Sequence, residues 1–337
     1  MLNFSPQEYL SVENGAARLA EPINAAIRRE LDGGMRNIAF WGAGGVAFLT
    51  LPAVRLLQTK STFPTIADMG AEVVHTGNVN VGEGTLVVFA SVSGTTKEAV
   101  AALEFAKAQG ARVLTLTGTQ GTPLAELADI NFHNDCADPT SSENFYLQTL
   151  FIALSIMHHR GEFPEYDRVV AELQTLPDAL VGVKEQFEER ASAFAEDIKD
   201  EQHHVITSAG GAWYEAWYYS MCILEEMQWI WTRPIHASDF FHGTLELIES
   251  ETSVWVIKGE DEARALSDRV ERFVPTVSSK LRVFDTKDFA LPGISDDVRA
   301  LISPIVIAAA FERLSTHLER VRDHDLTIRR YYKKGDF

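Results

Sequence analysis

The stretch TLVVFASVSGTTKEA at residues 85–99 decides the fold class. It begins with a β-branched and aromatic run typical of a strand, passes through small polar residues and a glycine, and continues with helical periodicity. Similar strand-like runs occur at NIAFW (37–41) and RVLTLTG (112–118), with helical stretches between them. This alternation predicts a parallel sheet. Because the runs show little polar–apolar alternation, we expect strands that are buried on both faces.

The same order of elements returns later in the chain. IAFWGAGGVAFL, from residue 38, is matched by VITSAGGAWYEA, from residue 205. The stretch at 85–99 is matched by TSVWVIKGEDEARA, from residue 252, and RVLTLTG by RVFDTKD, from residue 282. All three offsets lie between 166 and 170 residues, about half of the 337-residue chain. We therefore predict an α/β protein with two similar lobes, each a parallel sheet flanked by helices in three layers.

Residues 142–200 lack strand signals and predict a helical connector of three helices, ENFYLQTLFIALSIMHH, EYDRVVAELQTLP and VGVKEQFEERASAFAEDI. We place the first domain, connector included, at residues 1–200 and the second at 201–337. The last connector helix is rich in charge, and we interpret its charged residues as a solvated face without chemistry. These residues are Lys184, Glu185, Glu188, Glu189 and Arg190. The apolar run at 301–311 predicts a buried helix, too short to span a bilayer.

The amino-acid composition excludes some classes of binding partner. A net charge of −18 would repel the nucleic acid backbone, so we expect no nucleic acid partner. The two cysteines, Cys136 and Cys222, lack C-x-x-C spacing, and the first residues lack a signal-peptide pattern. We expect a cytoplasmic protein without a membrane partner. The paired histidines at 158–159 and 203–204 are adjacent and poorly placed to face one ion, so neither a metal nor a cofactor is predicted.

The loop SVSGTT at 91–96 lies between a predicted strand and a predicted helix. An ordinary helix N-cap needs one serine or threonine, whereas this loop has several. A helix N-terminus with converging hydroxyl and N–H groups favours an anion, and we predict a phosphate site here. Its candidate residues are Ser91, Ser93, Thr95 and Thr96, around Gly94. The equivalent loop of the second lobe, KGEDEA at 258–263, is acidic and would repel phosphate, so we expect one site only.

The segment WGAGGVAF at 41–48 also lies where a strand ends and a helix begins. It nearly fits the dinucleotide fingerprint G-x-G-x-x-A, but the nearest plausible acidic residue for a ribose, Asp68, comes late. A tight turn that needs glycine for steric reasons is the other interpretation.

With these motifs the chain resembles the sugar isomerase (SIS) domain family, whose members bind phosphosugars through a Ser/Thr-rich loop at this place. The family pattern S-x-S-G-x-T matches residues 91–96. In tandem members such as the isomerase half of glucosamine-6-phosphate synthase, the first glycine turn usually adds a hydroxyl. Here Gly44 and Gly45 stand in that turn, so the resemblance implies a backbone contact or none.

The segment ILEEMQWIWTRPIHASDFFHGTLELIE, from residue 223, resembles a family segment in which a helix glutamate precedes His-Gly by sixteen residues. Glu226 and His242 hold these positions. The resemblance implies that Glu226 moves a proton between C1 and C2, and that His242, often supplied across a dimer interface, assists ring opening. We expect Trp229 and Trp231 to desolvate the carboxylate partly and raise its proton affinity. Without the resemblance, Glu226 would be interpreted as a surface residue.

The C-terminal sequence VRDHDLTIRRYYKKGDF resembles the tail of fructoselysine 6-phosphate deglycases, which Arg329 and the next three residues match. Thr244 stands where that subgroup usually has proline. A basic tail packed on an acidic body is the other interpretation. Further pocket candidates are Ser142, Glu143, His236, Arg330, Tyr331 and Tyr332.

The resemblance implies a deglycase that cleaves a 6-phosphorylated Amadori compound, of the fructosamine or fructoselysine 6-phosphate type, into a hexose 6-phosphate and an amine. It also implies a homodimer or higher homo-oligomer. Two alternatives remain open. One is an isomerase of an aminosugar phosphate, which would use the same glutamate and loop. The other is a phosphosugar sensor, for which we would expect a fused helix-turn-helix, and the region before the first strand is too short for one.

Overall fold

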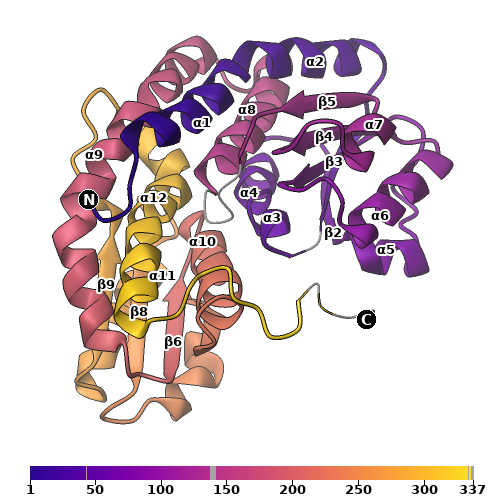
Figure 1. Ribbon diagram of the computed structural model, residues 1–337. Coiled ribbons are helices and arrows are strands. Elements are labelled where there is room, and N and C mark those ends of the chain that lie inside the picture. Colours follow the sequence, from indigo (N-terminus) through magenta and orange to yellow (C-terminus); the bar gives the residue numbers. More distant parts are fainter. Residues whose placement is uncertain (43, 137–141, 333, 335–337) are drawn as a thin grey trace. The chain divides into compact units, whose positions relative to one another are not determined.

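The computed structural model of the protein describes residues 1–42, 44–136, 142–332 and 334. These residues form two compact units (Figure 1). The first unit is Ser5–Asp178, and the second joins Met1–Phe4 to Ala179–Phe337. Each unit is built around one parallel sheet.

The first unit holds a five-stranded sheet in the order β2-β1-β3-β4-β5, and every neighbouring pair is parallel. Strand β3 is buried along its whole length, as its unbroken apolar run predicts. The strands are β1 (Asn37–Gly42), β2 (Thr65–Met69), β3 (Thr85–Ser91), β4 (Arg112–Thr117) and β5 (Ile130–His133).

Helices cover both faces of this sheet. Trp41, Val87 and Phe89 point to one face and pack with the apolar side of α5 and α6. Phe40 and Val88 alternate with them on the other face and are equally buried. Figure 1 shows α5 and α6 on one side of the sheet and α4 and α8 on the other. The helices are α1 (Pro6–Arg18), α2 (Ala20–Asp32), α3 (Gly45–Phe48), α4 (Leu51–Lys60), α5 (Gly70–Thr76), α6 (Lys97–Ala108), α7 (Pro123–Leu127) and α8 (Glu143–His159).

The second unit holds a four-stranded parallel sheet in the order β7-β6-β8-β9, the order of the first four strands of the other unit. This confirms the predicted fold class of two similar lobes. The strands without a sequence signal, β2, β5 and β7, all lie at sheet edges, where partial exposure interrupts the apolar run. Strand β7 contains Pro234, which an edge position tolerates. The strands are β6 (His203–Ser208), β7 (Trp231–His236), β8 (Ser253–Lys258) and β9 (Leu281–Asp285).

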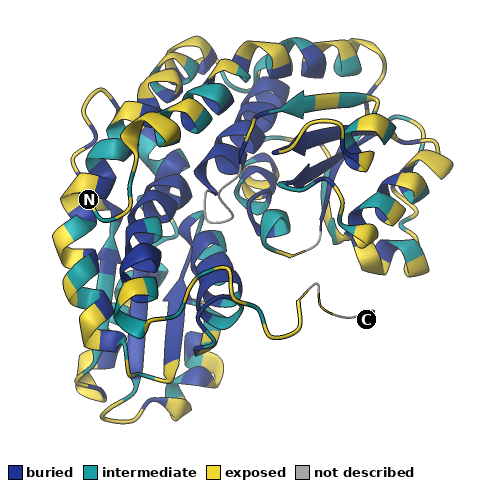
Figure 2. Ribbon diagram, in the orientation of Figure 1, coloured by how far each residue is buried: buried dark blue, intermediate teal, exposed yellow. Residues whose placement is uncertain are grey.

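An aromatic cluster forms the core on one face of the second sheet. The ring of Trp255 lies 4.9 Å from Phe194 and 5.6 Å from Phe284, and Phe284 lies 5.0 Å from Phe311. Figure 2 shows the sheet and much of α12 as buried. The helical elements are α9 (Tyr166–Ile198), α10 (Ala212–Tyr218), α11 (Arg264–Phe273), α12 (Asp296–Arg322), a π-helix η1 (Tyr219–Glu225), and 3₁₀ turns η2 (Phe240–His242), η3 (Thr244–Leu247), η4 (Val274–Thr276) and η5 (Thr286–Asp288).

The connector differs from its prediction. Its last two helical patterns form one helix, α9, that runs through Pro177. The two units divide directly after this proline, at residues 178 and 179, whereas the sequence placed the domain boundary at 200. The reason is packing: Phe187 and Phe194, in the later half of α9, contact Phe284 of the second sheet.

The prediction that the charged face of α9 is solvated was wrong for Lys184. Its side chain is fully buried, and Nζ lies 2.8 Å from a carboxylate oxygen of Glu312 on α12. Glu188 likewise accepts a hydrogen bond from Arg313 at 2.7 Å. Burial of these charges requires partners, and α12 supplies them.

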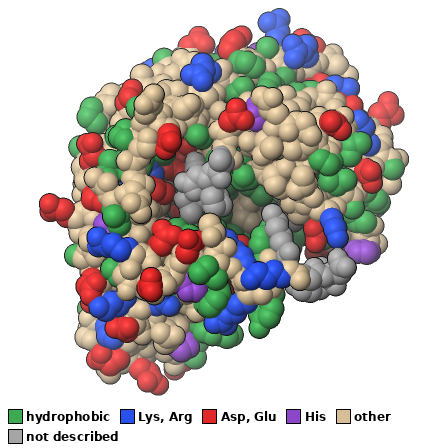
Figure 3. Space-filling view, viewed as in Figure 1, with side chains coloured by type: hydrophobic (Ala, Val, Ile, Leu, Met, Phe, Trp, Pro, Cys, Tyr) green, Lys and Arg blue, Asp and Glu red, His purple; other side chains and the backbone are tan. Residues whose placement is uncertain are grey.

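The surface of the chain carries both signs of charge. Figure 3 shows lysine and arginine side chains scattered among acidic ones over the visible face, rather than gathered in one basic surface. Among the described residues, no helix combines the length and the apolar character that a bilayer crossing requires.

Candidate active site

The predicted phosphate segments follow two adjacent strands. The chain leaves β1 for β2 on one side and returns to β3 on the other side of β1. In parallel sheets, ligands bind at such a switch point, beyond the carboxyl ends of the strands. Gly44 and Gly45 follow β1, and the loop 91–96 follows β3. The fold therefore brings both segments to the same edge of the sheet.

Hydrogen bonds within the loop determine its shape. Ser91 is buried, and its Oγ accepts a bond from the N–H of Gly94 at 2.9 Å. Gly94 has a φ of +62°, and a Cβ there would lie 2.1 Å from Oγ1 of Thr122, so glycine is required. Ser93 Oγ accepts a bond from the hydroxyl of Thr95 at 3.1 Å. Ser91 thus holds the loop in place, while Thr95 is exposed.

The start of α6 leaves donors available. Thr96 is the N-cap residue, and its side chain makes no capping hydrogen bond. The first backbone N–H groups of a helix have no partner within the helix and attract anions. Three of the predicted residues, Ser93, Thr95 and Thr96, therefore surround a helix N-terminus with anion-binding character.

Gly44, which follows β1, has space beside it. Its φ is +61°, and among the described residues no atom beyond its chain neighbours lies within 4 Å of a Cβ built on it. The acidic residue that a dinucleotide would need, Asp68, is already engaged: its Oδ2 accepts bonds from Trp41 Nε1 at 3.2 Å and Asn78 Nδ2 at 2.8 Å. These contacts weigh against the dinucleotide interpretation.

The second unit fills the same place with its own carboxylate. Asp261, in the loop after β8, accepts a bond from the N–H of Gly211 at 2.7 Å and from that of Ala263 at 3.0 Å. A Cβ on Gly210 would lie 2.1 Å from Asp261 Oδ2, so the carboxylate fits against the glycine turn. The turn after β6 corresponds to the turn at Gly44. Its backbone N–H donates to a carboxylate of the chain itself, that of Asp261.

Glu226 directly follows the π-helix η1, which places the two adjacent glutamates in different surroundings. Glu225 accepts two bonds from Thr232, one from its N–H at 3.3 Å and one from its hydroxyl at 2.6 Å. Glu226 instead accepts a bond from Nε of Arg329 at 2.8 Å, and its side chain is one-third exposed (34%). Trp231 is 73% exposed, so the prediction that it desolvates this carboxylate was wrong: an edge strand leaves the indole in solvent.

The C-terminal residues pack against the segment after Glu226. The guanidinium of Arg330 lies 3.9 Å from the ring centre of Trp229, a cation–π contact. The ring of His324 lies 4.3 Å from the same indole, and burial lowers the pKa of this histidine. Tyr331 and Tyr332 are exposed. Arg329 was missed as a site residue, although the tail motif contained it.

The predicted histidines lie on either side of one turn. His242 ends the 3₁₀ turn η2 and is exposed. His236 ends β7, where Nδ1 bonds to Ser238 and the ring meets Trp213 edge-on at 5.5 Å. Both histidines belong to the second unit with Glu226, whereas the phosphate candidates belong to the first.

Ser142 and Glu143, at the start of α8, lie inside the first unit. Both are buried, and Glu143 accepts bonds from the N–H of Ser142 at 3.1 Å and from the hydroxyl of Tyr9 at 3.2 Å. These contacts fix the start of α8.

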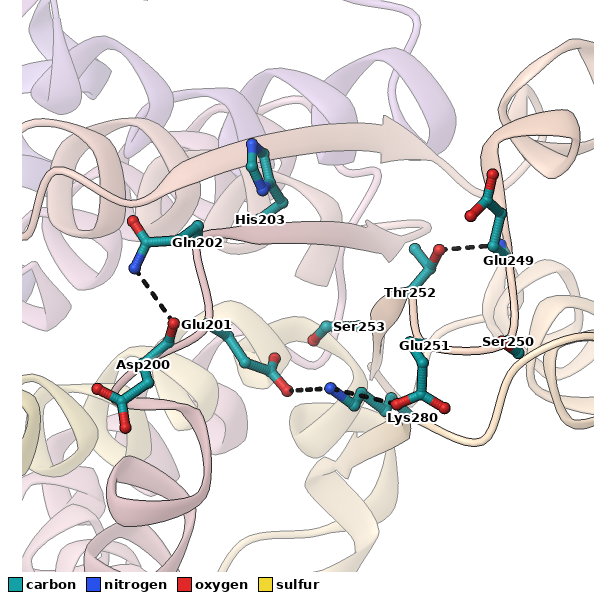
Figure 4. A pocket seen from close by; sticks show the side chains of 10 residues that line it. All are labelled: Asp200, Glu201, Gln202, His203, Glu249, Ser250, Glu251, Thr252, Ser253 and Lys280. Carbon is teal, nitrogen blue, oxygen red and sulfur yellow. Dashed lines mark hydrogen bonds and ion pairs between the residues drawn. The ribbon is translucent and has the colours of Figure 1, made fainter.

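A pocket of about 540 Å³ lies at the opposite, amino edge of the second sheet (Figure 4). It contains none of the predicted site residues. Its wall carries an ion pair between Lys280 and Glu201 at 3.2 Å. The lining includes the first residues of β6 and β8, so it is distant from the carboxyl ends where ligands bind in such folds. No group of three or more potential metal ligands occurs among the residues that the structure describes.

The chain is similar to known proteins in sequence and in fold. Residues 34–158 match the model of the SIS domain. The matched residues lie within the first unit. Fructosamine deglycase FrlB of Bacillus subtilis is 29% identical over 307 residues, which cover 89% of this chain and 92% of that protein. Fructoselysine 6-phosphate deglycase of Escherichia coli is 24% identical, covering 92% of this chain and 88% of its own.

Solved structures extend the SIS likeness to both units. A Bacillus subtilis protein solved as a candidate phosphosugar isomerase superposes with a TM-score of 0.88 at 27% identity, covering 96% of this chain and 99% of that one. The C-terminal domain of glucosamine-fructose-6-phosphate aminotransferase from Francisella tularensis has a TM-score of 0.81 at 16% identity, covering 95% and 96%. The second likeness concerns the fold alone. The SIS domain match and the similarity to named deglycases together make the chain an enzyme.

Proposed function

We propose that this enzyme belongs to the SIS family and is a deglycase that cleaves a 6-phosphorylated Amadori compound, a 1-amino-1-deoxyketose phosphate, into a hexose 6-phosphate and an amine. The observation that carries the proposal is the similarity to two named deglycases, which extends along about nine tenths of the chain and includes both units. The positions of Glu226 and His242 fit the chemistry, because the reaction needs a base for a carbon-bound proton and a group that opens the sugar ring.

In this proposal, the substrate phosphate binds at the edge of the first sheet. Ser93, Thr95 and Thr96 donate hydroxyl hydrogen bonds, and the first amides of α6 add backbone donors. The second unit supports a further donor. There the N–H of Gly211 binds the carboxylate of Asp261, and by the repeat the corresponding donor in the first unit is the N–H of Gly45. Backbone groups thereby replace the hydroxyl that the family usually places in this turn.

The chemical steps follow from the side chains. His242 hands a proton to the ring oxygen as the ring opens, a transfer that histidine performs near neutral pH. Glu226 then removes a proton from C1 to give an enaminol. Reprotonation at C2 produces an imine, and water adds to the imine carbon and releases the amine and the hexose 6-phosphate.

The assembly that fits this mechanism is a homodimer in which His242 acts in the partner's site. His242 is exposed at the end of a short turn, where a second chain can reach it. The other candidate reaction, isomerisation of an aminosugar phosphate, needs the same proton transfer but omits the hydrolysis.

The decisive experiment is incubation of the purified protein with a panel of Amadori compounds, phosphorylated at C6 or not. We expect stoichiometric release of hexose 6-phosphate and free amine from phosphorylated members only, and no release by the Glu226→Gln variant. Conversion of an aminosugar phosphate without release of amine would contradict the deglycase proposal and support the isomerase reaction.

A further inference from the structure

The chain beyond α12, residues 323–332, forms an ordered segment that we name the C-terminal strap. Helix α12 ends where Asp323 adopts a left-handed conformation (φ 48°). Beyond it, Asp325 Oδ1 accepts bonds from both the N–H and the hydroxyl of Thr327 at 2.6 Å, and Glu319 of α12 accepts the N–H of Leu326 at 3.1 Å. The strap therefore has a defined course before it reaches Glu226.

The strap is bound on both sides of Arg329. The side-chain amide of Gln228 donates to the carbonyl of His324 at 2.9 Å, and the His324 ring packs on Trp229. Arg330 covers the same indole at 3.9 Å. These contacts join the strap to the residues that directly follow Glu226.

Arg329 is held rigidly within this arrangement. Its Nη1 donates to the carbonyls of Leu326 and Ile328, and Nε donates to Oε1 of Glu226 at 2.8 Å. The arginine side chain is only 14% exposed, compared with 34% for the glutamate. A planar guanidinium with several donors fixes the direction of each bond more strongly than an ammonium does. Within the described part of the chain, Oε2 of Glu226 accepts no hydrogen bond, so one oxygen is held and the other is available.

We infer that Arg329 is a positioning residue for Glu226: it holds Oε1 so that Oε2 faces the proton to be moved. This inference rests on the proposed function, because it presumes that Glu226 is the base. A carboxylate that must rotate into place before each transfer loses the advantage of a preset geometry. Arg329 itself stays outside the proton transfer.

Three variants test the inference in the full-length protein. We expect Arg329→Ala to lower kcat roughly ten- to hundredfold, the range of one charge-assisted hydrogen bond, with KM within about twofold. Arg329→Lys should retain an intermediate kcat, because it keeps the charge but not the fork. Arg320→Ala is the matched control: Arg320 lies on α12 and donates to Ser192 at 3.3 Å, so wild-type kinetics are expected.

Chemical rescue separates positioning from folding. Guanidinium ion, at a concentration that leaves the wild type unaffected, should restore part of kcat to Arg329→Ala and none to Glu226→Gln. Wild-type kcat in Arg329→Ala overturns the inference, as does a lowered kcat that guanidinium fails to raise. If the wild type releases no amine from any member of the panel, the proposed function fails instead. The contact between Arg329 and Glu226 is then tested by the melting temperatures of Arg329→Ala, Glu226→Gln and the double variant. If the double variant loses as much melting temperature as the two single variants together, the inference is overturned; a loss that differs from this sum supports it.

Discussion

The carboxylate of Asp261 lies 2.7 Å from the backbone nitrogen of Gly211 and fills the glycine turn of the second sheet. In the first unit, no described atom beyond the chain neighbours lies within 4 Å of a Cβ built on the corresponding Gly44. One lobe thus carries an internal anion, whereas the described residues of the other lobe leave space at this position. The repeat has diverged through a change of loop residues, while the strand order of the two sheets stayed the same.

Removal of this internal anion should weaken the second unit. Asp261→Ala leaves the N–H groups of Gly211 and Ala263 without their acceptor, and we expect a loss of about 1–3 kcal/mol in the free energy of unfolding. Asp261→Asn keeps an acceptor oxygen and should lose less. Urea denaturation measures both variants, and equal stability of Asp261→Ala and the wild type would contradict this role.

Loss of two hydroxyls in the phosphate loop should weaken substrate binding. Ser93→Ala combined with Thr96→Ala removes two donors to a charged group, each worth roughly 1.5–3 kcal/mol. We expect KM for the phosphorylated substrate to rise at least about tenfold, with little change in melting temperature. Thr59→Ala, on the exposed face of α4, is the control. An unchanged KM in the double variant would place the phosphate elsewhere.

The sequence predicted the central strands better than the edges. β1, β3, β6 and β8 are nearly completely buried, so their apolar runs are continuous, whereas β7 is half-exposed and reads as an irregular segment. The unit boundary was missed because Pro177 lies inside a continuous helix, and only packing shows to which unit each half of α9 belongs.

The candidate site residues also differ in how far the sequence could indicate them. Local motifs indicated the loop at 91–96 and the pair Glu226 and His242 as candidates, because their spacing along the chain carries the signal. The contact of Arg329 with Glu226 could not be predicted from the sequence, because the two residues are 103 positions apart. The tail motif contained Arg329, and only the folded chain shows which side chain it meets.

Replacement of Glu226 by glutamine should abolish turnover while substrate binding persists. The amide keeps the shape of the side chain but cannot accept a carbon-bound proton, so we expect kcat to fall by at least about 10²–10⁴. Glu225→Gln is the internal control, because an amide oxygen can still accept the bonds from Thr232. If both variants retain wild-type kcat, another residue must be the base.

Stability should fall in mild acid because of His204. Burial lowers the pKa of this histidine from 6.5 to about 4, and its Nδ1 faces Ser253 at 2.7 Å and Glu201 at 3.4 Å. The unfolded chain binds the proton more readily, so this contribution is complete above about pH 6.5 and is lost as the pH falls toward 4.

The variant His204→Asn should reduce the slope of unfolding free energy against pH in this window by up to about one proton. The exposed neighbour offers the control: His203→Asn should keep the wild-type slope. His159, His317 and His324, whose pKa values burial also lowers, remain in both variants and supply the residual slope. Identical slopes in His204→Asn and the wild type would contradict the assignment.

Subunit mixing tests whether His242 acts across an interface. Glu226→Gln and His242→Asn should each be inactive alone, because one lacks the base and the other lacks the group that opens the ring. In a mixed dimer with a shared site, one of the two sites contains both mutations and the other contains intact Glu226 and His242 from different chains. With equal mixing and free exchange, about half of the dimers are mixed and each has one intact site, so we expect about a quarter of wild-type activity. Light scattering verifies the dimer, and tagged subunits verify exchange. If exchange occurs without recovery of activity, both groups act within one chain.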